Sequence, residues 1–313
     1  MKQLVILSGK GGTGKTSVTA AFAHLASPGP FADQIILADA DVDAANLELV
    51  LRPERVNTEP FRGGEVAVID EDRCAQCGDC ESVCRFDAIV ETDAGWLIDP
   101  VACEGCAACV HQCPTESIAM QEQTVGEYAY SDSRYGPLHH AHLYPGQESS
   151  GKLVTDVRQR ASRQALDEQR RLVLIDGPPG IGCPVIASVS GADLALLVTE
   201  PTVAGIHDLR RALKTLQHFG VPALVCINKA DVYPVGAREI EAYCRANGID
   251  GVGRIPFDPA VPGAMVAGEA VTAYRPDAPA SLALSAVWER VVAALSETPA
   301  GSHDARVDQQ RRG

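Results

Sequence analysis

Residues 8–17 read SGKGGTGKTS and contain the pattern Gly-x-x-x-x-Gly-Lys-Ser/Thr. In this pattern the glycines let backbone N–H groups curl around phosphate oxygens, the lysine reaches the outer phosphates, and the final hydroxyl faces Mg²⁺. We therefore predict a site for Mg²⁺ and a nucleotide. The residues expected to contact the nucleotide are Gly9, Lys10, Gly11, Gly12, Thr13, Gly14, Lys15, Thr16 and Ser17, with Thr16 also on Mg²⁺.

Carboxylates end two apolar runs that are typical of buried strands. Asp176 closes the run RLVLI, where it is expected to hold Mg²⁺ through water, and GPPGIG follows as a turn suited to sensing the γ-phosphate. Asp39 and Asp41 end the run QIILADAD, and one of them is expected to orient or activate the attacking water. The segment NKAD at 228–231 follows another apolar run, as a base-recognition loop would. These features predict nucleotide hydrolysis.

Eight of the eleven cysteines form two runs with the spacing C-x2-C-x2-C-x3-C, which repeat at an interval of 29 residues. This is the spacing of bacterial two-cluster ferredoxins, in which three cysteines of one run and the fourth of the other hold each [4Fe–4S] cluster. Zinc, the competing metal, would leave the third cysteine of each run unexplained. The expected ligands are Cys74, Cys77, Cys80 and Cys113 for the first cluster and Cys103, Cys106, Cys109 and Cys84 for the second.

The elements that must position these residues alternate between short apolar runs and segments of helical length. This order predicts an α/β fold with a doubly wound, mostly parallel sheet of the P-loop NTPase type. The cysteine segment interrupts it, so we expect a small α+β two-cluster ferredoxin domain inserted at 61–124. Residues 1–60 and 125–296 then form the two parts of the ATPase domain, and the polar tail at 297–313 is expected to be disordered.

Charge and hydropathy exclude several partners. The net charge is −14, and residues 65–122 hold 13 acidic residues against two arginines. No basic stripe is present to neutralise phosphates, which argues against nucleic acid. No apolar stretch is long enough for a membrane span or a signal peptide, and the C-terminal VWERVVAAL lacks the basic face of a membrane anchor. We therefore expect a cytoplasmic protein.

Five segments together resemble a known superfamily: GKGGTGKTS, LADADVDAANLELVL, LIDGPPGIG, INKAD and IPFDPAVPGAMVAGEAV. They are similar to the deviant-Walker-A ATPases, which include the Min cell-division ATPase, the partition ATPases, the Mrp-type iron–sulfur carriers and the nitrogenase iron protein. The likeness covers nearly the whole chain outside residues 60–150. With its cysteine segment, the chain resembles the MinD-superfamily ATPases that contain an inserted ferredoxin domain.

The resemblance implies roles for particular residues. The superfamily forms a dimer with ATP sandwiched between its subunits, and Lys10 would cross that interface to the phosphates bound by the other subunit. Such a cation stabilises charge on the transferred phosphoryl group, so hydrolysis would be slow without a dimer or a stimulating partner. The alternative is a solvated loop lysine. Asp41 would be the water-orienting carboxylate, acting with Lys10 and Lys15, and Asn228, Asp231 and Pro256 would contact adenine.

Three functions remain open. The first is an ATP-dependent redox protein in which a dimer switch, between identical chains or with a paralogous ATPase, gates electron transfer to a partner that docks on the acidic segment. The second is an Mrp-type assembly or carrier protein, although Cys183, Cys226 and Cys244 are far apart where carriers have a C-x-x-C pair. The third is a spatial organiser of the Min or partition kind.

Two features have no assigned role. His139, His140 and His142 could bind a metal or a partner, but their alternation favours the exposed face of a strand. Cys183 could sense the nucleotide state from its place beside GPPGIG, but a small buried cysteine is the favoured interpretation.

Overall fold

The computed structural model describes residues 1–147 and 150–298, and these form two compact units. The sheet unit comprises residues 1–58, 128–142 and those from 150 on. The cysteine unit comprises 59–127 and the stretch from 143 to the gap, so it extends slightly beyond the 61–124 expected from the sequence. Of the tail expected to be disordered, the part from 299 on lies outside the described residues.

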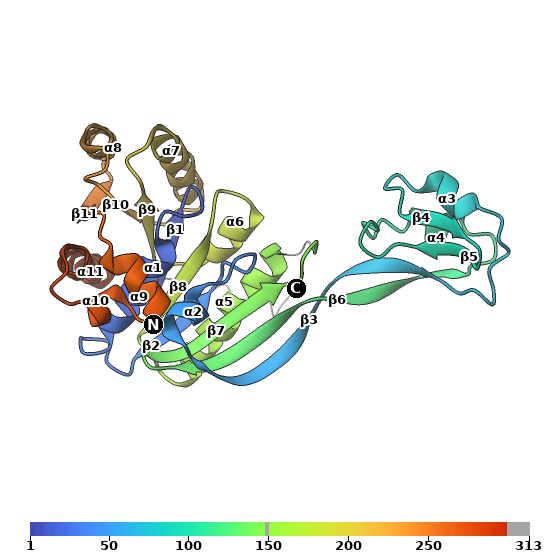
Figure 1. Ribbon diagram of the computed structural model, residues 1–313, viewed down its shortest axis with the longest axis horizontal. Helices are drawn as coiled ribbons and strands as arrows, with labels where there is room; N and C mark the ends of the chain where they lie inside the picture. Colours follow the sequence, from blue (N-terminus) through green and yellow to red (C-terminus); the bar gives the residue numbers. More distant parts are fainter. Residues whose placement is uncertain (148–149, 299–313) are drawn as a thin grey trace. The chain divides into compact units, whose positions relative to one another are not determined.

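Nine strands of the described residues form one sheet in the order β11-β10-β9-β1-β8-β2-β7-β6-β3 (Figure 1). All pairings from β11 to β7 are parallel, which confirms the expected mostly parallel α/β sheet. The strands are β1 (Lys2–Ser8), β2 (Ile35–Asp39), β3 (Glu54–Ile69), β6 (Ile118–Ser133), β7 (Gly136–Leu143), β8 (Leu172–Pro179), β9 (Leu194–Thr199), β10 (Ala223–Asn228) and β11 (Asp250–Ile255).

Helices of the sheet unit pack in separate groups, as a doubly wound fold requires. In the first group, α1 packs on α2, α10 and α11, and α9 packs on α2 and α10. In the second group α5 packs on α6, and in the third α7 packs on α8. Their bounds are α1 (Lys15–Ala26), α2 (Leu47–Leu51), α5 (Ser150–Asp167), α6 (Cys183–Val189), α7 (Val203–His218), α8 (Pro234–Ala246), α9 (Ala260–Ala267), α10 (Val271–Tyr274) and α11 (Pro279–Glu297). No helix in the described ranges combines the length and the apolarity needed to cross a membrane.

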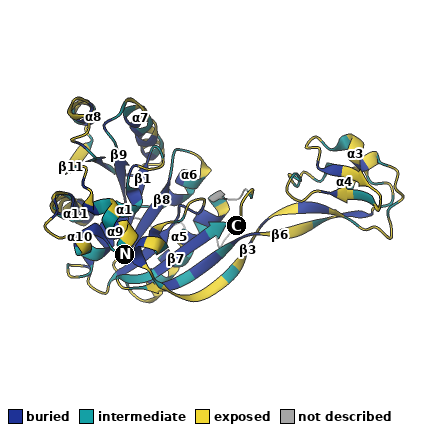
Figure 2. Cartoon of the chain, viewed as in Figure 1, coloured by how far each residue is buried: buried dark blue, intermediate teal, exposed yellow. Residues whose placement is uncertain are grey.

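The central strands are buried along their length, as Figure 2 shows. Because helices cover both faces of a parallel sheet, its strands read as continuous apolar runs rather than as alternating ones. On the face covered by α1 and α11, Phe22 and Trp288 bring their rings to 4.9 Å between centroids. This packing holds α1, and therefore the loop that precedes it, against the sheet.

The cysteine unit repeats its backbone at the same 29-residue interval as its cysteines. Helix α3 (Asp79–Val83) recurs as α4 (Ala108–Gln112), and the hairpin of β4 (Ile89–Thr92) and β5 (Gly95–Ile98) lies between them in the chain. The left-handed residues Gln76, Gly78 and Asp87 recur as Gly105, Ala107 and Glu116. Strands β3 and β6 connect this unit to the sheet unit along the chain.

The buried apolar cluster of the cysteine unit is small and contains sulfur. Cys80 and Cys109 belong to it, together with Ala67, Ile89, Ile98 and Ile118. So small a core rarely stabilises a domain without disulfides or bound metal. The side chains of the cysteines are thus part of the packing as well as candidate ligands.

Replacing Trp288 with Ala should lower the free energy of unfolding by about 3–5 kcal/mol, because this side chain is only 5% exposed and closes the core over α1. Chemical denaturation of the full chain measures the change. Leu282→Ala in the same helix is the matched control, since Leu282 is 61% exposed and its loss should change the value by less than about 0.5 kcal/mol. Equal effects of the two substitutions would contradict this account of the core.

Candidate functional site

The phosphate-binding loop lies between β1 and α1, where its backbone N–H groups meet the start of a helix. Gly12 and Gly14 adopt left-handed φ angles of 77° and 94°, which side chains rarely adopt. A Cβ on Gly9 would lie 2.3 Å from the Cβ of Asp208 in α7. The glycines of the motif therefore meet both a conformational and a steric requirement.

Lys15 lies inside this loop and is 5% exposed. Its Nζ is 3.8 Å from Oδ2 of Asp41, which pairs the two residues expected to act on the outer phosphate. Burial raises the pKa of Asp41 to about 6, and the charge of Lys15 opposes the shift. Asp41 is therefore ionised at neutral pH but titrates within reach of it.

Asp39 acts as an anchor in this structure. Its Oδ1 accepts from the N–H of Asp41 at 3.1 Å, and its Oδ2 accepts from the N–H groups of Asn46 and Leu47 at 3.1 and 3.0 Å. Both oxygens of Asp39 thus bind the backbone that carries Asp41 to the start of α2. Of the two carboxylates that the sequence offers for orienting water, Asp41 is the one whose oxygens are not committed to the backbone.

Asp176 aligns with Asp39 on the neighbouring strand and is equally buried. Its Oδ1 accepts from the Thr19 hydroxyl at 2.9 Å, while its Oδ2 has no hydrogen-bond partner among the described residues. Burial raises the pKa of Asp176, and the charge of Lys15 and the hydrogen bond from Thr19 oppose the shift. A buried carboxylate oxygen without a donor fits a position beside metal-bound water. The residues present therefore suit Mg²⁺.

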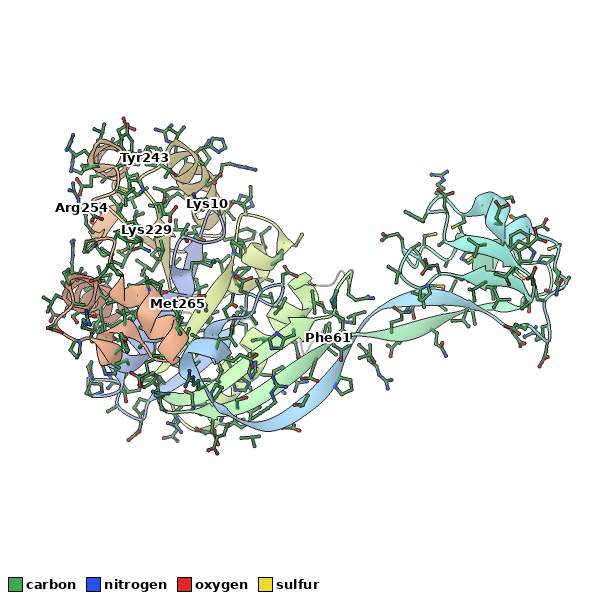
Figure 3. The ribbon with its side chains drawn as sticks, viewed as in Figure 1. Lys10, Phe61, Lys229, Tyr243, Arg254 and Met265 are labelled. Atoms are coloured by element: carbon green, nitrogen blue, oxygen red, sulfur yellow. The ribbon has the colours of Figure 1, made fainter. Side chains whose placement is uncertain are left out.

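Lys10 binds a carboxylate of its own chain. Its Nζ lies 3.1 Å from Oε2 of Glu200, which follows β9, and Nζ of Lys229 donates to Oε1 of the same residue at 2.6 Å (Figure 3). Burial tends to raise the pKa of Glu200, but hydrogen bonds from both lysines outweigh it and lower the pKa. Sequence reasoning missed Glu200, although an acid after the buried run LALLVT is the same signal that identified Asp176.

The residues expected to contact adenine lie in two segments that a side chain–backbone hydrogen bond joins. The amide of Asn228 donates to the carbonyl of Thr13 at 2.7 Å, so it supports the phosphate loop directly. Oδ1 of Asp231 accepts from the N–H of Phe257, the residue after Pro256, at 2.7 Å. The segment NKAD therefore lies against the phosphate loop, with the amide of Asn228 already engaged there.

The eight cysteines line two small cavities. The backbone explains why each cavity draws on both runs. The N–H of Asp70, before the first run, donates to the carbonyl of Ser117, after the second run, at 2.7 Å. The N–H of Asp99, before the second run, donates to the carbonyl of Ala88, after the first run, at 2.8 Å. One cavity is lined by Cys74, Cys77, Cys80 and Cys113, and the other by Cys84, Cys103, Cys106 and Cys109.

The two cavities differ in the hydrogen bonds to the one cysteine that comes from the other run, which is Cys113 in one cavity and Cys84 in the other. Sγ of Cys113 lies 3.2 Å from the Ser117 hydroxyl and 3.6 Å from the Thr115 hydroxyl, and it accepts the N–H of Ser117 at 3.4 Å. These bonds, chiefly that of the Ser117 hydroxyl, lower the pKa of Cys113 to about 7. The positions equivalent to Thr115 and Ser117 near Cys84 hold Phe86 and Ala88, which have no hydroxyl.

Two interpretations of the remaining candidates were wrong. His139 and His140 are buried rather than exposed, because helices cover both faces of the sheet at β7, and burial lowers the pKa of each to about 4. Cys183, expected to be buried, is exposed at the start of α6. Cys226 and Cys244 are buried as expected for structural cysteines.

Comparisons with known proteins cover most of the chain. Residues 4–271 match the family described as the CobQ/CobB/MinD/ParA nucleotide binding domain. The chain is 36% identical over 229 residues to the uncharacterized protein MJ0578 of Methanocaldococcus jannaschii, which covers 72% of this chain and 78% of that protein. It is 27% identical over 161 residues to an iron–sulfur cluster carrier protein of Pyrococcus furiosus. That match covers 47% of this chain and 54% of the carrier protein.

Solved structures share the fold. The septum site-determining protein MinD from Pyrococcus horikoshii, complexed with Mg-ADP, has a TM-score of 0.55 and 20% sequence identity, with 93% of this chain and 95% of that chain covered. A MinC:MinD cell-division protein complex from Aquifex aeolicus gives the same TM-score and identity.

The pH dependence of ATP hydrolysis should report the ionisation of Asp41. Because its pKa of about 6 lies above the ordinary value, kcat/KM for MgATP should fall about tenfold per pH unit below pH 6 and level off above pH 7. Steady-state phosphate release measures the profile. Asp41→Asn should lose most of the activity together with this inflection, and an unchanged inflection in that variant would show that another group titrates.

Proposed function

Because this chain belongs to the CobQ/CobB/MinD/ParA nucleotide-binding family, we propose that it is an ATP-dependent iron–sulfur redox protein. In this proposal, ATP binding and hydrolysis in a dimer control electron transfer through two [4Fe–4S] clusters to a partner protein. The observation that carries it is the pair of cavities, each lined by four cysteines. A cluster with four protein ligands is bound permanently, so it carries electrons rather than being delivered as cargo.

The sheet unit would supply the hydrolysis. The amides of the phosphate loop and Lys15 would hold the phosphates, with the Thr16 hydroxyl facing the ion and Asp176 behind it. Bound Mg²⁺ would neutralise charge on the β- and γ-phosphates. Asp41 would orient the water whose oxygen attacks the γ-phosphorus while the bond to the ADP oxygen breaks, and ADP and phosphate are the products.

Lys10 would make this reaction depend on a dimer. Within one chain it is bound by Glu200, so reaching the phosphates of a second subunit requires it to leave that carboxylate. Lys229 remains on Glu200, so the acid keeps one positive partner after Lys10 has moved. The exchange therefore leaves no unpaired carboxylate, which supports a switch between the two arrangements rather than a fixed ion pair.

The cysteine unit would supply the electron path and the docking surface. Residues 65–122 carry a net charge of −11, which favours a partner with a basic face and steers its approach. Because thiolate-bound clusters need a reducing compartment, we place this activity in the cytoplasm.

An Mrp-type carrier is the second candidate, and the likeness to the Pyrococcus furiosus carrier protein favours it. Such a protein binds a labile cluster across its dimer through exposed cysteines. Among the described residues of the sheet unit, Cys183 is exposed, whereas Cys226 and Cys244 are buried. One exposed cysteine per chain supports this candidate less well than eight cysteines in two cavities support the first.

The deciding experiment uses the full chain purified without oxygen. About eight iron and eight sulfide per chain are expected from two clusters. Cluster reduction by a low-potential donor is followed by EPR with and without MgATP, together with cluster transfer to an apo-acceptor. A change in rate or potential on adding MgATP, with the clusters retained, supports the proposal. A cluster reduction rate and potential that do not change with MgATP, combined with efficient cluster transfer to the apo-acceptor, would favour the carrier.

Lys10→Ala should lower the rate of ATP hydrolysis by about 10²–10³-fold, the usual loss when one group that stabilises transition-state charge is removed, while leaving nucleotide binding nearly unchanged. Lys214→Ala, an exposed lysine of α7, is the matched control and should hydrolyse ATP at the normal rate. Normal hydrolysis by the Lys10 variant would assign this lysine to its bond with Glu200 alone.

The two clusters should differ in reduction potential. Among the described residues, hydroxyl groups contact Cys113 and no other proposed ligand, and hydrogen bonds to sulfur stabilise the more negative reduced state. Ser117→Ala should lower the higher potential by about 40 mV, equivalent to about 1 kcal/mol in a one-electron couple. The reciprocal variant Ala88→Ser should raise the lower one. Redox titration followed by EPR measures both, and coincident potentials that neither variant separates would contradict the assignment.

A further inference from the structure

A cluster of metal-ligating side chains in the sheet unit has no part in the proposed function. His140 and His142 alternate along β7, so both lie on one face of the strand, and Glu48 of α2 contacts them. Nδ1 of His140 is 3.3 Å from Oε2 of Glu48, and Nε2 of His142 is 3.2 Å from Oε1. One ligand atom from each residue lies within 4.8 Å of the other two.

His140 provides a second, independent observation. Its side chain is 0% exposed, and its Nε2 lies 2.9 Å from the Ser131 hydroxyl. Its Nδ1 faces Glu48 without making a hydrogen bond, and it is one of few buried polar atoms in the described residues without a partner. Burying an imidazole nitrogen without a hydrogen bond is unfavourable, and binding a cation at this nitrogen would offset the lost interaction with water.

We propose that Glu48, His140 and His142 bind a divalent transition-metal ion. Two imidazoles and one carboxylate are a ligand set of Zn²⁺ and of non-haem Fe²⁺. Ligand atoms at about 2.0–2.1 Å from a tetrahedral ion lie roughly 3.4 Å apart, close to the two nitrogen–oxygen separations. The Ser131 hydroxyl holds the other nitrogen of His140, as outer partners of metal-bound histidines do.

Arg55 is the competitor for this site. Its guanidinium donates to Oε2 of Glu48 at 3.2 Å, the oxygen that also faces His140. The Arg55 side chain is 47% exposed, so its ion pair with Glu48 lies on the solvent side of the cluster. His142 is partly exposed and leaves a route for the ion and for a water ligand.

The ion would act on the position of α2. This five-residue helix starts at the amides that Asp39 binds, and Asp39 aligns with His140 on the neighbouring strand. A metal on Glu48 ties α2 to β7 and so limits movement of the segment from Asp41 to Asn46. The site would thereby couple metal occupancy to the loop that carries the water-orienting carboxylate.

The test uses the full chain with its cysteines loaded with clusters, so that thiolates do not compete, and Co²⁺ as the probe. One equivalent should bind, with ligand-field bands in the difference spectrum against the Co²⁺-free chain and no new thiolate charge-transfer band, and Zn²⁺ and Fe²⁺ are then compared as competitors. Glu48→Gln and His142→Ala should each weaken binding by about 100-fold, and Ser131→Ala by about 10-fold. The control His218→Ala removes an exposed histidine of α7 and should change nothing.

Each outcome decides the proposal. Loss of the Co²⁺ bands in both ligand variants, but not in the control, supports it. Absence of bands in the wild-type chain, or equal binding by all variants, overturns it. Because His142 is partly exposed, its replacement leaves no core cavity, and the far-UV spectrum of that variant should match the wild type. The measurement needs neither ATP hydrolysis nor electron transfer. Of the proposed function it requires only that the cysteines hold their clusters, and the iron and sulfide content of the sample checks this separately.

Discussion

The carboxyl ends of the parallel strands bring several acidic side chains to one edge of the sheet, and each must be neutralised there. The chain meets this constraint in three ways. Asp39 accepts three backbone N–H groups, Asp176 accepts a hydroxyl and keeps one oxygen without a partner, and Glu200 binds two lysines. How each acid is compensated decides whether it anchors the backbone, keeps an oxygen available for the proposed Mg²⁺ or binds Lys10.

The same constraint connects the nucleotide site to elements outside it. Oδ2 of Asp39 accepts from the N–H of Leu47, the first residue of α2. Glu48, the next residue of that helix, contacts the two histidines of β7. A change in the position of α2 would therefore reach both the segment at Asp41 and the histidine cluster. The proposed metal site and the proposed hydrolysis involve separate ligands but share one short helix.

In the cysteine unit the corresponding constraint is the lack of apolar side chains. The unit contains two tandem copies of a 29-residue segment. Backbone hydrogen bonds join the start of each copy to the end of the other copy. This pairing draws the fourth cysteine of each set from the other run, and the sulfur atoms fill space that a larger domain would give to leucine and isoleucine. Binding of clusters and stability of the unit are therefore expected to be linked.

Local patterns in the sequence determined the elements and the chemistry that depends on neighbours in the chain. Continuous apolar runs identified the buried strands, the loop glycines identified the phosphate site, and the 29-residue interval identified the duplication, because each rests on local spacing. The pairing of Lys10 with Glu200, the anchoring role of Asp39 and the burial of His140 could not be predicted in this way. Each depends on which strands become neighbours in the sheet, since β1 lies beside β9 and β2 beside β7 only after long crossovers. Sequence spacing identified candidate groups, and tertiary structure alone decided which of them meet, because hydrogen bonds and ion pairs act over a few ångströms in space whatever the distance along the chain.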